Sequence, residues 1–474
     1  MAKSTEFQCS ECGHRPPKWT GRCGACGAWD AIAEAAPARG FGRPGLGGPG
    51  LGSGPLGKAV SVREVAAEAA RAWPTGVGEL DRVLGGGIVP GSAVLVAGEP
   101  GVGKSTLLLD VAARAAAGGR SVLYLSGEES LAQVAARAER IGADHPALRL
   151  AAACDLDQVA AVVGEEGPEL LVIDSIQTIG WAQASGVPGG TSLVRAVTAE
   201  LVGAAKARSM ACLLVGHVTK DGQVAGPRTI EHLVDAVLMF EGERDATLRW
   251  LRATKNRFGA ADEVGCFQMA EDGIEEVADP SGLFLEDPAH PVAGTCAGVT
   301  LEGLRPMGVA VQALTAAGPK KSKPARACIG LESGRLALVL AVLQARANVG
   351  LRALDVYVST VGGVKCPDPA MDLPLALACV SARFGLPLPP GVVAIGEVGL
   401  AGQLREVKGT ARRLAEAQRL GFRRALVPPL GAKTRRAVPA GLELVELGTL
   451  AQAVHLLGEA AAEAVAKPAP ARAN

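Results

Sequence analysis

Short apolar runs alternate with longer Ala-rich stretches between residues 59 and 285. Apolar runs of this length predict strands that are buried on both faces of a parallel sheet. We expect such strands at 93–97 (AVLVA), 121–125 (SVLYL), 170–174 (LLVID) and 211–216 (ACLLVG). The Ala-rich stretches, for example 105–118, predict the helices that cover this sheet. The region is therefore expected to be an α/β domain.

Composition separates this domain from the rest of the chain. Residues 40–57 contain nine Gly and three Pro, so they cannot bury a core and are expected to be a flexible linker. The expected regions are a cysteine-rich finger at 1–33, the linker at 34–58, the α/β domain at 59–285, a domain of mixed strands and helices at 286–458, and a disordered tail at 459–474.

Charge and hydropathy limit the partners of the chain. Lys plus Arg and Asp plus Glu both number 48, so the formal net charge is zero. Contact with nucleic acid must then come from a local basic surface. The first ten residues lack the apolar core of a signal peptide, and no uncharged apolar stretch approaches the roughly 18 residues of a membrane span. We expect a cytoplasmic protein without a membrane segment.

The segment GEPGVGKST satisfies the motif G-x-x-x-x-G-K-[ST] directly between an expected strand and an expected helix. In this context the backbone N–H groups of a Gly-rich loop surround phosphates, and the helix N-terminus points its partial positive charge at them. Lys104 would reach the β and γ phosphates of ATP, and Ser105 would contact Mg²⁺. The expected nucleotide-binding residues are Gly98, Glu99, Pro100, Gly101, Val102, Gly103, Lys104, Ser105 and Thr106.

Polar residues follow three other expected strands, at the sheet edge where ligands gather in open α/β folds. Asp174 would be a second Mg²⁺ ligand, with a helix cap as the alternative. Glu128 is preferred over Glu129 as the residue that orients water for hydrolysis. His217 would sense the γ-phosphate, with a structural role as the alternative. Together with 75–106, these positions resemble the core of RecA-like ATPases, in which the same strand carries the catalytic Glu.

Lys255 and Arg257 stand two residues apart in KNRFG, after the expected strand TLRWLRAT. The strand period of two aims both cations in the same direction. RecA-like ATPases commonly assemble with nucleotide between subunits. The resemblance therefore implies that both cations complete the neighbouring subunit's pocket and stabilise charge on the transferring phosphoryl group. A solvated pair on an edge strand is the alternative.

KNRFG, the phosphate loop, the cysteine cluster and the C-terminal region together resemble the RadA/Sms family of bacterial recombination and repair ATPases, over essentially the whole chain. The resemblance implies a homo-hexameric, DnaB-like motor on single-stranded DNA that promotes branch migration of branched recombination intermediates. It further implies a DNA-dependent ATPase activity, a recombinase partner, and a part for Lys255 and Arg257 in DNA engagement.

Two long loops that follow consecutive strands, 177–190 and 219–229, would face the channel of such a ring. Lys220 and Arg228 are the candidate cations in them, and Trp181 is a candidate stacking surface for bases. A mobile loop without a DNA contact is the alternative for each residue.

The cysteines Cys9, Cys12, Cys23 and Cys26 form two C-x-x-C pairs separated by ten residues. Four thiolates complete a tetrahedral Zn²⁺ site, and so short a segment needs the metal for its folding energy. Two disulfides are the alternative, which a cytoplasmic setting disfavours. RadA/Sms proteins open with the same four-cysteine zinc finger.

The C-terminal segments 358–385 and 394–422 resemble the proteolytic domain of Lon. Lon chemistry needs a Ser nucleophile and a Lys general base, but the matching positions here are Ala370 and Ala411. We expect an α+β scaffold without proteolytic activity. Its candidate phosphate contacts are Arg405, Lys408, Arg412 and Arg413, with a solvated helix face as the alternative. An ATP-dependent Lon-like protease and a RecA-family signalling ATPase without DNA are the competing functions.

Overall fold

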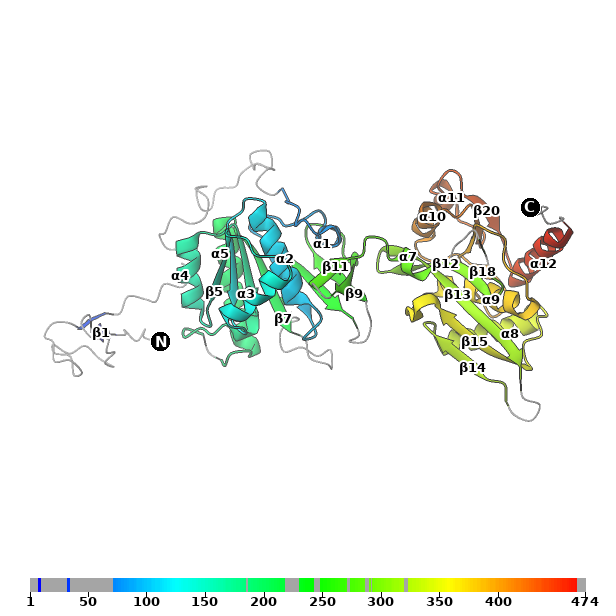
Figure 1. Cartoon of the computed structure of the whole chain (residues 1–474), viewed down its shortest axis with the longest axis horizontal. Helices are drawn as coiled ribbons and strands as arrows, with labels where there is room; N and C mark the ends of the chain where they lie inside the picture. Colours follow the sequence, from blue (N-terminus) through cyan, green and yellow to red (C-terminus); the bar gives the residue numbers. More distant parts are fainter. Residues whose placement is uncertain are drawn as a thin grey trace, which may run out of the picture. The chain divides into compact units, whose positions relative to one another are not determined.

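The computed structural model describes residues 7–9, 32–34, 71–184, 186–217, 230–242, 248–270, 273–285, 290, 292–318 and 323–466, with the backbone alone at 7–9, 32–34 and 460–466. These residues fall into two compact units, the first ending at Glu276 and the second beginning at Val277 (Figure 1). The first unit also includes two short antiparallel strands, β1 (Phe7–Cys9) and β2 (Ile32–Glu34).

A nine-stranded sheet with the order β11-β10-β9-β8-β3-β7-β6-β4-β5 forms the centre of the first unit. The six strands from β8 to β5 pair in parallel, and β9, β10 and β11 add an antiparallel edge. The strands are β3 (Ala93–Gly98), β4 (Val122–Ser126), β5 (Leu148–Ala152), β6 (Leu170–Asp174), β7 (Ala211–His217), β8 (Ala236–Glu241), β9 (Leu248–Asn256), β10 (Val264–Ala270) and β11 (Gly273–Glu276). The four apolar runs are β3, β4, β6 and β7, so the predicted parallel sheet is confirmed.

Helices cover both faces of this sheet because its central strands are apolar on both sides. They are α1 (Gly78–Leu84), α2 (Lys104–Ala117), α3 (Leu131–Arg140), α4 (Leu156–Glu166) and α5 (Thr191–Arg208). One core packs α1, α2 and α3 against the sheet, and a second core packs α4 and α5 on the other face. Local signals set some helix ends: at α3, the side chains of Ser130 and Gln133 form a reciprocal capping box.

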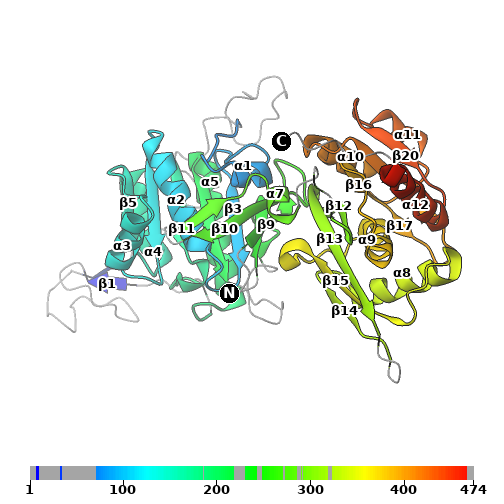
Figure 2. The same ribbon diagram turned by 45° about the vertical axis from the view of Figure 1, so that its right-hand side comes forward.

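The second unit contains a seven-stranded sheet of mixed direction with the order β14-β15-β13-β12-β16-β19-β20 (Figure 2). Its strands are β12 (Thr295–Glu302), β13 (Arg305–Ala317), β14 (Arg326–Ile329), β15 (Leu354–Thr360), β16 (Val392–Ala394), β19 (Arg424–Val427) and β20 (Glu443–Glu446), with a separate pair β17 (Glu397–Val398) and β18 (Leu404–Arg405). Its helices are α7 (Ser281–Phe284), α8 (Ser333–Arg346), α9 (Asp372–Phe384), α10 (Thr410–Arg419), α11 (Ala432–Arg436) and α12 (Leu450–Ala466).

Two glycines in this sheet show how closely helices pack on its faces. A Cβ on Gly298 would meet Pro374 of α9 at 2.6 Å, and a Cβ on Gly308 would meet Leu420, just after α10, at 2.7 Å. Gly298 lies opposite Val309 in the β12–β13 register, and Gly308 lies opposite Val299. Since neighbouring residues along a strand face opposite sides, α9 and the end of α10 lie on opposite faces of the sheet. The expected α+β architecture of this region is thus confirmed.

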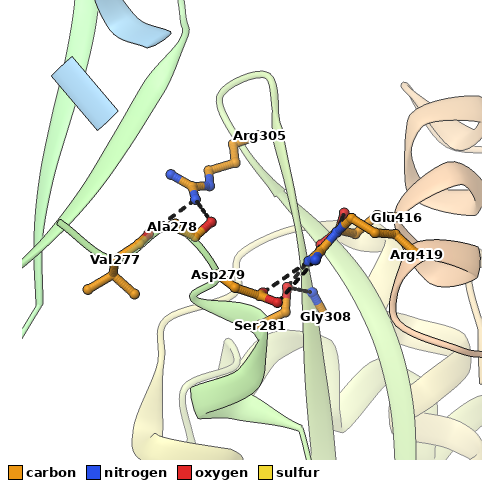
Figure 3. A network of polar contacts seen from close by, with 8 residues as sticks. All are labelled: Val277, Ala278, Asp279, Ser281, Arg305, Gly308, Glu416 and Arg419. Atoms are coloured by element: carbon orange, nitrogen blue, oxygen red, sulfur yellow. Dashed lines mark hydrogen bonds and ion pairs between the residues drawn. The ribbon is translucent and has the colours of Figure 1, made fainter. Parts of the chain in front are cut away.

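A polar network holds the first residues of the second unit (Figure 3). Arg305 donates from Nη2 to the carbonyl oxygens of Val277 and Ala278, at 3.3 and 2.8 Å. The guanidinium of Arg419 forms two hydrogen bonds with the carboxylate of Asp279, at 3.0 and 3.1 Å. Because these bonds begin at residue 277, the residues up to 285 belong to the second unit, whereas composition had placed them in the first.

At the other end of this unit, α12 continues to Ala466. The helix therefore occupies the first half of the segment 459–474, for which composition predicted a disordered tail. Within the described residues, no helix combines the length and the apolar composition that a membrane crossing requires.

Candidate nucleotide-binding site

The Gly-rich loop between β3 and α2 has the backbone that its motif predicts. Gly101 and Gly103 have φ values of 82° and 111°, in the left-handed region that favours glycine. A Cβ on Gly98 would lie 2.4 Å from the carbonyl oxygen of Phe240 on β8, so only glycine lets β3 pack there. A Cβ on Gly101 would meet no atom within 4 Å. This open space against the backbone fits a bound phosphate.

Lys104 begins α2, and its side chain is held against the loop. It is buried, and Nζ donates to the carbonyl oxygens of Gly98 and Glu99, both at 2.8 Å. Burial lowers the pKa of this ammonium group to about 8, while the negative charges of Asp174 and Glu128 oppose the shift. The predicted lysine and the two predicted carboxylates therefore lie within electrostatic reach of one another.

Asp174 ends β6 and is buried. The hydroxyl of Tyr124, a fully buried residue of β4, donates to Asp174 Oδ2 at 2.7 Å. Burial raises the pKa of Tyr124 far above its usual range, and the charge of Asp174 adds to this effect, so the hydroxyl stays a donor. The short helix η2 (Ile176–Thr178) follows, with Ser175 as its N-cap and no capping bond from a side chain. A buried carboxylate that is held in place by a tyrosine hydroxyl suits the Mg²⁺ ligand role predicted for it, and Ser105, the other predicted ligand, lies in the first turn of α2.

Three neighbouring strands, β4, β6 and β7, deliver a polar cluster to the carboxyl edge of the sheet. Glu128 follows β4, and its Oε1 accepts a 2.5 Å hydrogen bond from the hydroxyl of Ser175, directly after β6. His217, the last residue of β7, contacts the same oxygen through Nε2 at 2.9 Å. Because a carboxylate can only accept, Nε2 of His217 carries the proton. The structure thus brings Glu128 and His217 together.

Glu129 has different partners. Its carboxylate forms an ion pair with Arg137 of α3, and the side chain of Arg137 is largely buried. Its backbone carbonyl accepts a hydrogen bond from Ser126, and its N–H donates back to the Ser126 hydroxyl. The Glu129 carboxylate is directed to α3, whereas the Glu128 carboxylate lies with the residues at the ends of β6 and β7, so the geometry favours Glu128 for activating water.

Lys255 and Arg257 lie at the opposite edge of the same sheet. Lys255, near the end of β9, donates from Nζ to the carbonyl oxygens of Glu231 and Val234, at 2.6 and 2.8 Å. Arg257 pairs with the carboxylate of Asp235 at 2.8 Å. Burial lowers the pKa of Lys255, and the charge of Arg257 lowers it further, as expected for two cations close together. Both cations contact the segment 231–235, which precedes β8.

The remaining residues of KNRFG shape the turn that follows β9. The side-chain amide of Asn256 donates to the carbonyl oxygens of Val83 and Leu84, the last residues of α1. Its Oδ1 accepts the N–H of Phe258. A Cβ on Gly259 would approach Gly85 to 2.9 Å. Asn256 and Gly259 thus fix the position of the two cations that the motif carries.

The predicted DNA contacts are only partly described. Lys220 and Arg228 lie outside the described residues. Trp181 is half-buried and packs against the core between the sheet and α4 and α5, so its ring is less open to bases than the sequence suggested.

The Lon-like region lacks a catalytic pair at the matching positions. Ala370 is fully buried, and Ala411 lies in the first turn of α10. Ser381 is also fully buried; its hydroxyl accepts the N–H of Gly294 at 2.8 Å and donates to the carbonyl oxygen of Leu386. This serine therefore has a structural role, and it does not stand at a position of the Lon motif.

The prediction that Arg413 contacts phosphate is wrong. This side chain is buried, pairs with Asp368 at 2.7 Å and donates to the carbonyl oxygens of Val299 and Lys408. An arginine enclosed in this way cannot reach DNA. The other three candidates, Arg405, Lys408 and Arg412, are exposed.

The side chains of the four cysteines predicted to bind zinc, Cys9, Cys12, Cys23 and Cys26, lie outside the described part of the structure. The strands β1 and β2 pair antiparallel around this segment, with Cys9 opposite Ile32.

Three family models match separate parts of the chain. Residues 7–34 match a rubredoxin metal-binding domain, which contains the four cysteines. Residues 77–223 match the AAA domain, and residues 361–430 match subunit ChlI of Mg-chelatase. These matches agree with a zinc ribbon, a RecA-like nucleotide-binding core and a Lon-like C-terminal domain.

Several relatives extend over nearly the whole length. DNA repair protein RadA of Mycolicibacterium smegmatis is 51% identical over 461 residues, covering 96% of this chain and 97% of that protein. DNA repair protein RadA of Escherichia coli is 41% identical, covering 97% of this chain and 100% of that protein. The protein of the same name in Bacillus subtilis is 40% identical, covering 96% and 99%. With 40% identity or more over at least 96% of its length, the chain belongs to the family of DNA repair protein RadA.

Proposed function

We propose that this chain is a DNA-dependent ATPase that acts as a DnaB-like motor on single-stranded DNA and promotes branch migration of recombination intermediates during DNA repair. The AAA family match supports the ATPase, and the name of the relatives, DNA repair protein RadA, supports the place in repair. The observation that carries the proposal is the position of Lys255 and Arg257, on the sheet edge opposite their own phosphate loop.

Distance excludes these cations from their own pocket. Asp235, the partner of Arg257, donates its backbone N–H to the carbonyl oxygen of Ala93, at the amino end of β3, and its carboxylate accepts the N–H of Ala93. The phosphate loop begins at Gly98, the other end of this strand of six residues. At about 3.3 Å per residue, the two ends are roughly 17 Å apart. Cations at this edge that contact a nucleotide would therefore contact the nucleotide bound to another subunit, as in a ring with head-to-tail contacts.

Within one pocket, each residue has a separate task. Residues 98–106 hold the phosphates, with Lys104 neutralising charge. Ser105 and Asp174 are the Mg²⁺ ligands, and a bound Mg²⁺ would neutralise the phosphates and orient them. Glu128 would orient the attacking water and accept its proton. Arg257 and Lys255 of the neighbouring subunit would stabilise charge on the transferring phosphoryl group, a contribution of about 10³ to 10⁵ in rate for arginine fingers.

His217 offers a link between DNA and hydrolysis. It is hydrogen-bonded to Glu128, and in the sequence it is followed closely by 219–229, the predicted loop with the candidate DNA contacts Lys220 and Arg228. DNA bound there would move His217 and thereby change the position of the Glu128 carboxylate. The expected assembly is a homo-hexamer on single-stranded or branched DNA, with a recombinase as a partner and a zinc finger at 1–33.

The protease alternative lacks support in the second unit. The two Lon catalytic positions carry methyl groups, and Ser381 is enclosed in backbone hydrogen bonds. The binding of single-stranded DNA distinguishes the proposed motor from an ATPase that acts without DNA. Absence of any mobility shift at low salt, with or without ADP, would exclude the motor.

The test of the proposed function is the ATPase rate per subunit, measured against protein concentration with and without single-stranded DNA. Wild type should gain activity as subunits assemble and again when DNA is added. Arg257→Ala should lose at least about 10³-fold at all concentrations. Arg140→Ala, at an exposed position of α3, is the matched control and should behave as wild type. A rate per subunit that is independent of concentration, together with an active Arg257→Ala, would refute pockets shared between subunits.

A further inference from the structure

Asp235 is a buried carboxylate that joins two parts of the first unit. It is 5% exposed and directly precedes β8. Its Oδ2 accepts the N–H of Ala93 at 3.1 Å, and its Oδ1 accepts from Nη1 of Arg257 at 2.8 Å. The backbone is equally tied, since the N–H of Asp235 donates to Ala93 and its carbonyl oxygen accepts the N–H of Arg257. Asp235 thus connects Arg257 to the first residue of β3.

Arg257 is held at one point and otherwise reaches into solvent. Its side chain is 52% exposed, and Asp235 is 7% exposed as a side chain. Among the described residues, Nη1 is the only donor of this guanidinium with a hydrogen-bond partner, and a guanidinium has five N–H donors. The remaining donors are available to an external anion with planar oxygen pairs, such as a phosphate.

This pair contributes little to folding. Ion pairs with a half-exposed partner typically change stability by about 0 to 1 kcal/mol, because water screens them. The pair instead fixes the orientation of the Arg257 side chain, since a long arginine side chain otherwise samples many rotamers. A fixed guanidinium loses less conformational entropy when it meets its target.

A second cation approaches the same carboxylate. Lys206, in the last turn of α5, places Nζ 3.8 Å from Oδ1 of Asp235 and is half-exposed. Lys255 lies close by and is held by the carbonyl oxygens of Glu231 and Val234. Arg257, Lys206 and Lys255 thus outnumber the nearby carboxylates of Asp235 and Glu231, and the surface keeps an excess of positive charge that suits a polyphosphate.

We propose that Asp235 is a positioning residue for hydrolysis in the neighbouring subunit. It orients Arg257 toward the triphosphate of that subunit. It also fastens Arg257 to β3 of the same chain, and the opposite end of β3 leads into this chain's own phosphate loop. This inference rests on the proposed function, in which Arg257 acts between subunits. In each subunit, β3 would then connect the subunit's own nucleotide pocket with the arginine that acts in the next pocket. This gives the ring a direct physical link between consecutive sites.

The test compares steady-state ATP hydrolysis by full-length Asp235→Asn, Arg257→Ala and the double variant, in the presence of single-stranded DNA. Asn keeps an acceptor for the N–H of Ala93 but removes the charge that holds Arg257. We expect kcat to fall about 10- to 100-fold, the usual effect of a misplaced catalytic group, with little change in KM. Because Asp235 acts through Arg257, adding Asp235→Asn to Arg257→Ala should cause no further loss.

Glu169→Gln is the matched control. Glu169 directly precedes β6, at the same edge of the sheet, and its carboxylate also accepts from an arginine, Arg120, and from the N–H of Ser121. It should keep wild-type kcat. If Asp235→Asn does not give a folded protein by thermal melting, Asp235→Ser replaces it with the same expectation.

The outcomes separate the two ideas. An Asp235→Asn variant with wild-type kcat beside an inactive Arg257→Ala would overturn the positioning role alone. A further loss in the double variant would show that Asp235 acts on the fold and not through Arg257. A fully active Arg257→Ala would overturn the proposed function itself.

Discussion

Removing one hydroxyl, by Tyr124→Phe, tests whether the buried tyrosine holds Asp174 in position as the proposed Mg²⁺ ligand. The phenol donates to Asp174 at 2.7 Å, and the ring is fully buried in the core between the sheet and the helices α1, α2 and α3. Phenylalanine keeps the ring packing and removes only the hydrogen bond. Bonds to a charged acceptor are worth about 1.5 to 3 kcal/mol, so a loss of about 2 kcal/mol of unfolding free energy is expected. For a unit of this size that corresponds to roughly 4 to 8 °C in Tm.

The effect on metal should be larger than the effect on stability. Loss of a residue that holds a metal ligand typically costs about 10- to 100-fold in metal affinity. ATP hydrolysis titrated with Mg²⁺ at fixed ATP should therefore need at least about tenfold more Mg²⁺ for half-maximal rate. Tyr357→Phe is the control, because Tyr357 is the other tyrosine of the chain and lies 40% exposed on β15. The reasoning fails if both variants match wild type in Tm and Mg²⁺ requirement.

Three further predictions concern the other regions. Arg413→Ala should destabilise the second unit by about 3 to 5 kcal/mol in a denaturant titration, because it leaves the partly buried Asp368 carboxylate without its cation, whereas exposed Arg412→Ala should change stability by less than about 0.5 kcal/mol. Arg419→Ala should speed limited proteolysis at 277–285, because two hydrogen bonds to Asp279 are lost; unchanged cleavage would contradict the anchoring role. Purified protein should contain about one Zn²⁺ per chain by metal analysis, and Cys12→Ser should lose it; retention of the metal would exclude the four-thiolate site.

The sheet and the phosphate loop could be predicted because their signals are local. The run at 170–174 is apolar throughout and ends in an acid, and it became β6 with Asp174 at its last residue. The antiparallel edge β9–β11 was predicted only in part, from the apolar pattern of 247–254. The partners of the cations could not be predicted, since Asp235 stands in no motif and contacts Ala93 across 142 residues.

Two further features, the role of Tyr124 and the burial of Arg413, are not evident from residue type alone. Tyr124 reads as one more apolar residue of its strand, and its contact with Asp174 depends on the pairing of β4 with β6. The sequence predicts Arg413 as a surface cation, yet α10 buries Thr410, Arg413, Leu414 and Ala417. Their spacing of three, four and seven residues is that of a buried helix stripe, so the helical period would have placed Arg413 inside.

The central claim, a pocket completed by the neighbouring subunit, is tested most directly by mixing two inactive variants. Lys104→Ala subunits lack the phosphate-binding lysine but keep Arg257, and Arg257→Ala subunits have the reverse defect. Random assembly of equal amounts would join an intact pocket to an intact arginine at roughly one head-to-tail junction in four. We predict that the mixture recovers ATP hydrolysis approaching that fraction of the wild-type rate. A mixture as inactive as its separate components, although the two variants co-assemble, would contradict the account.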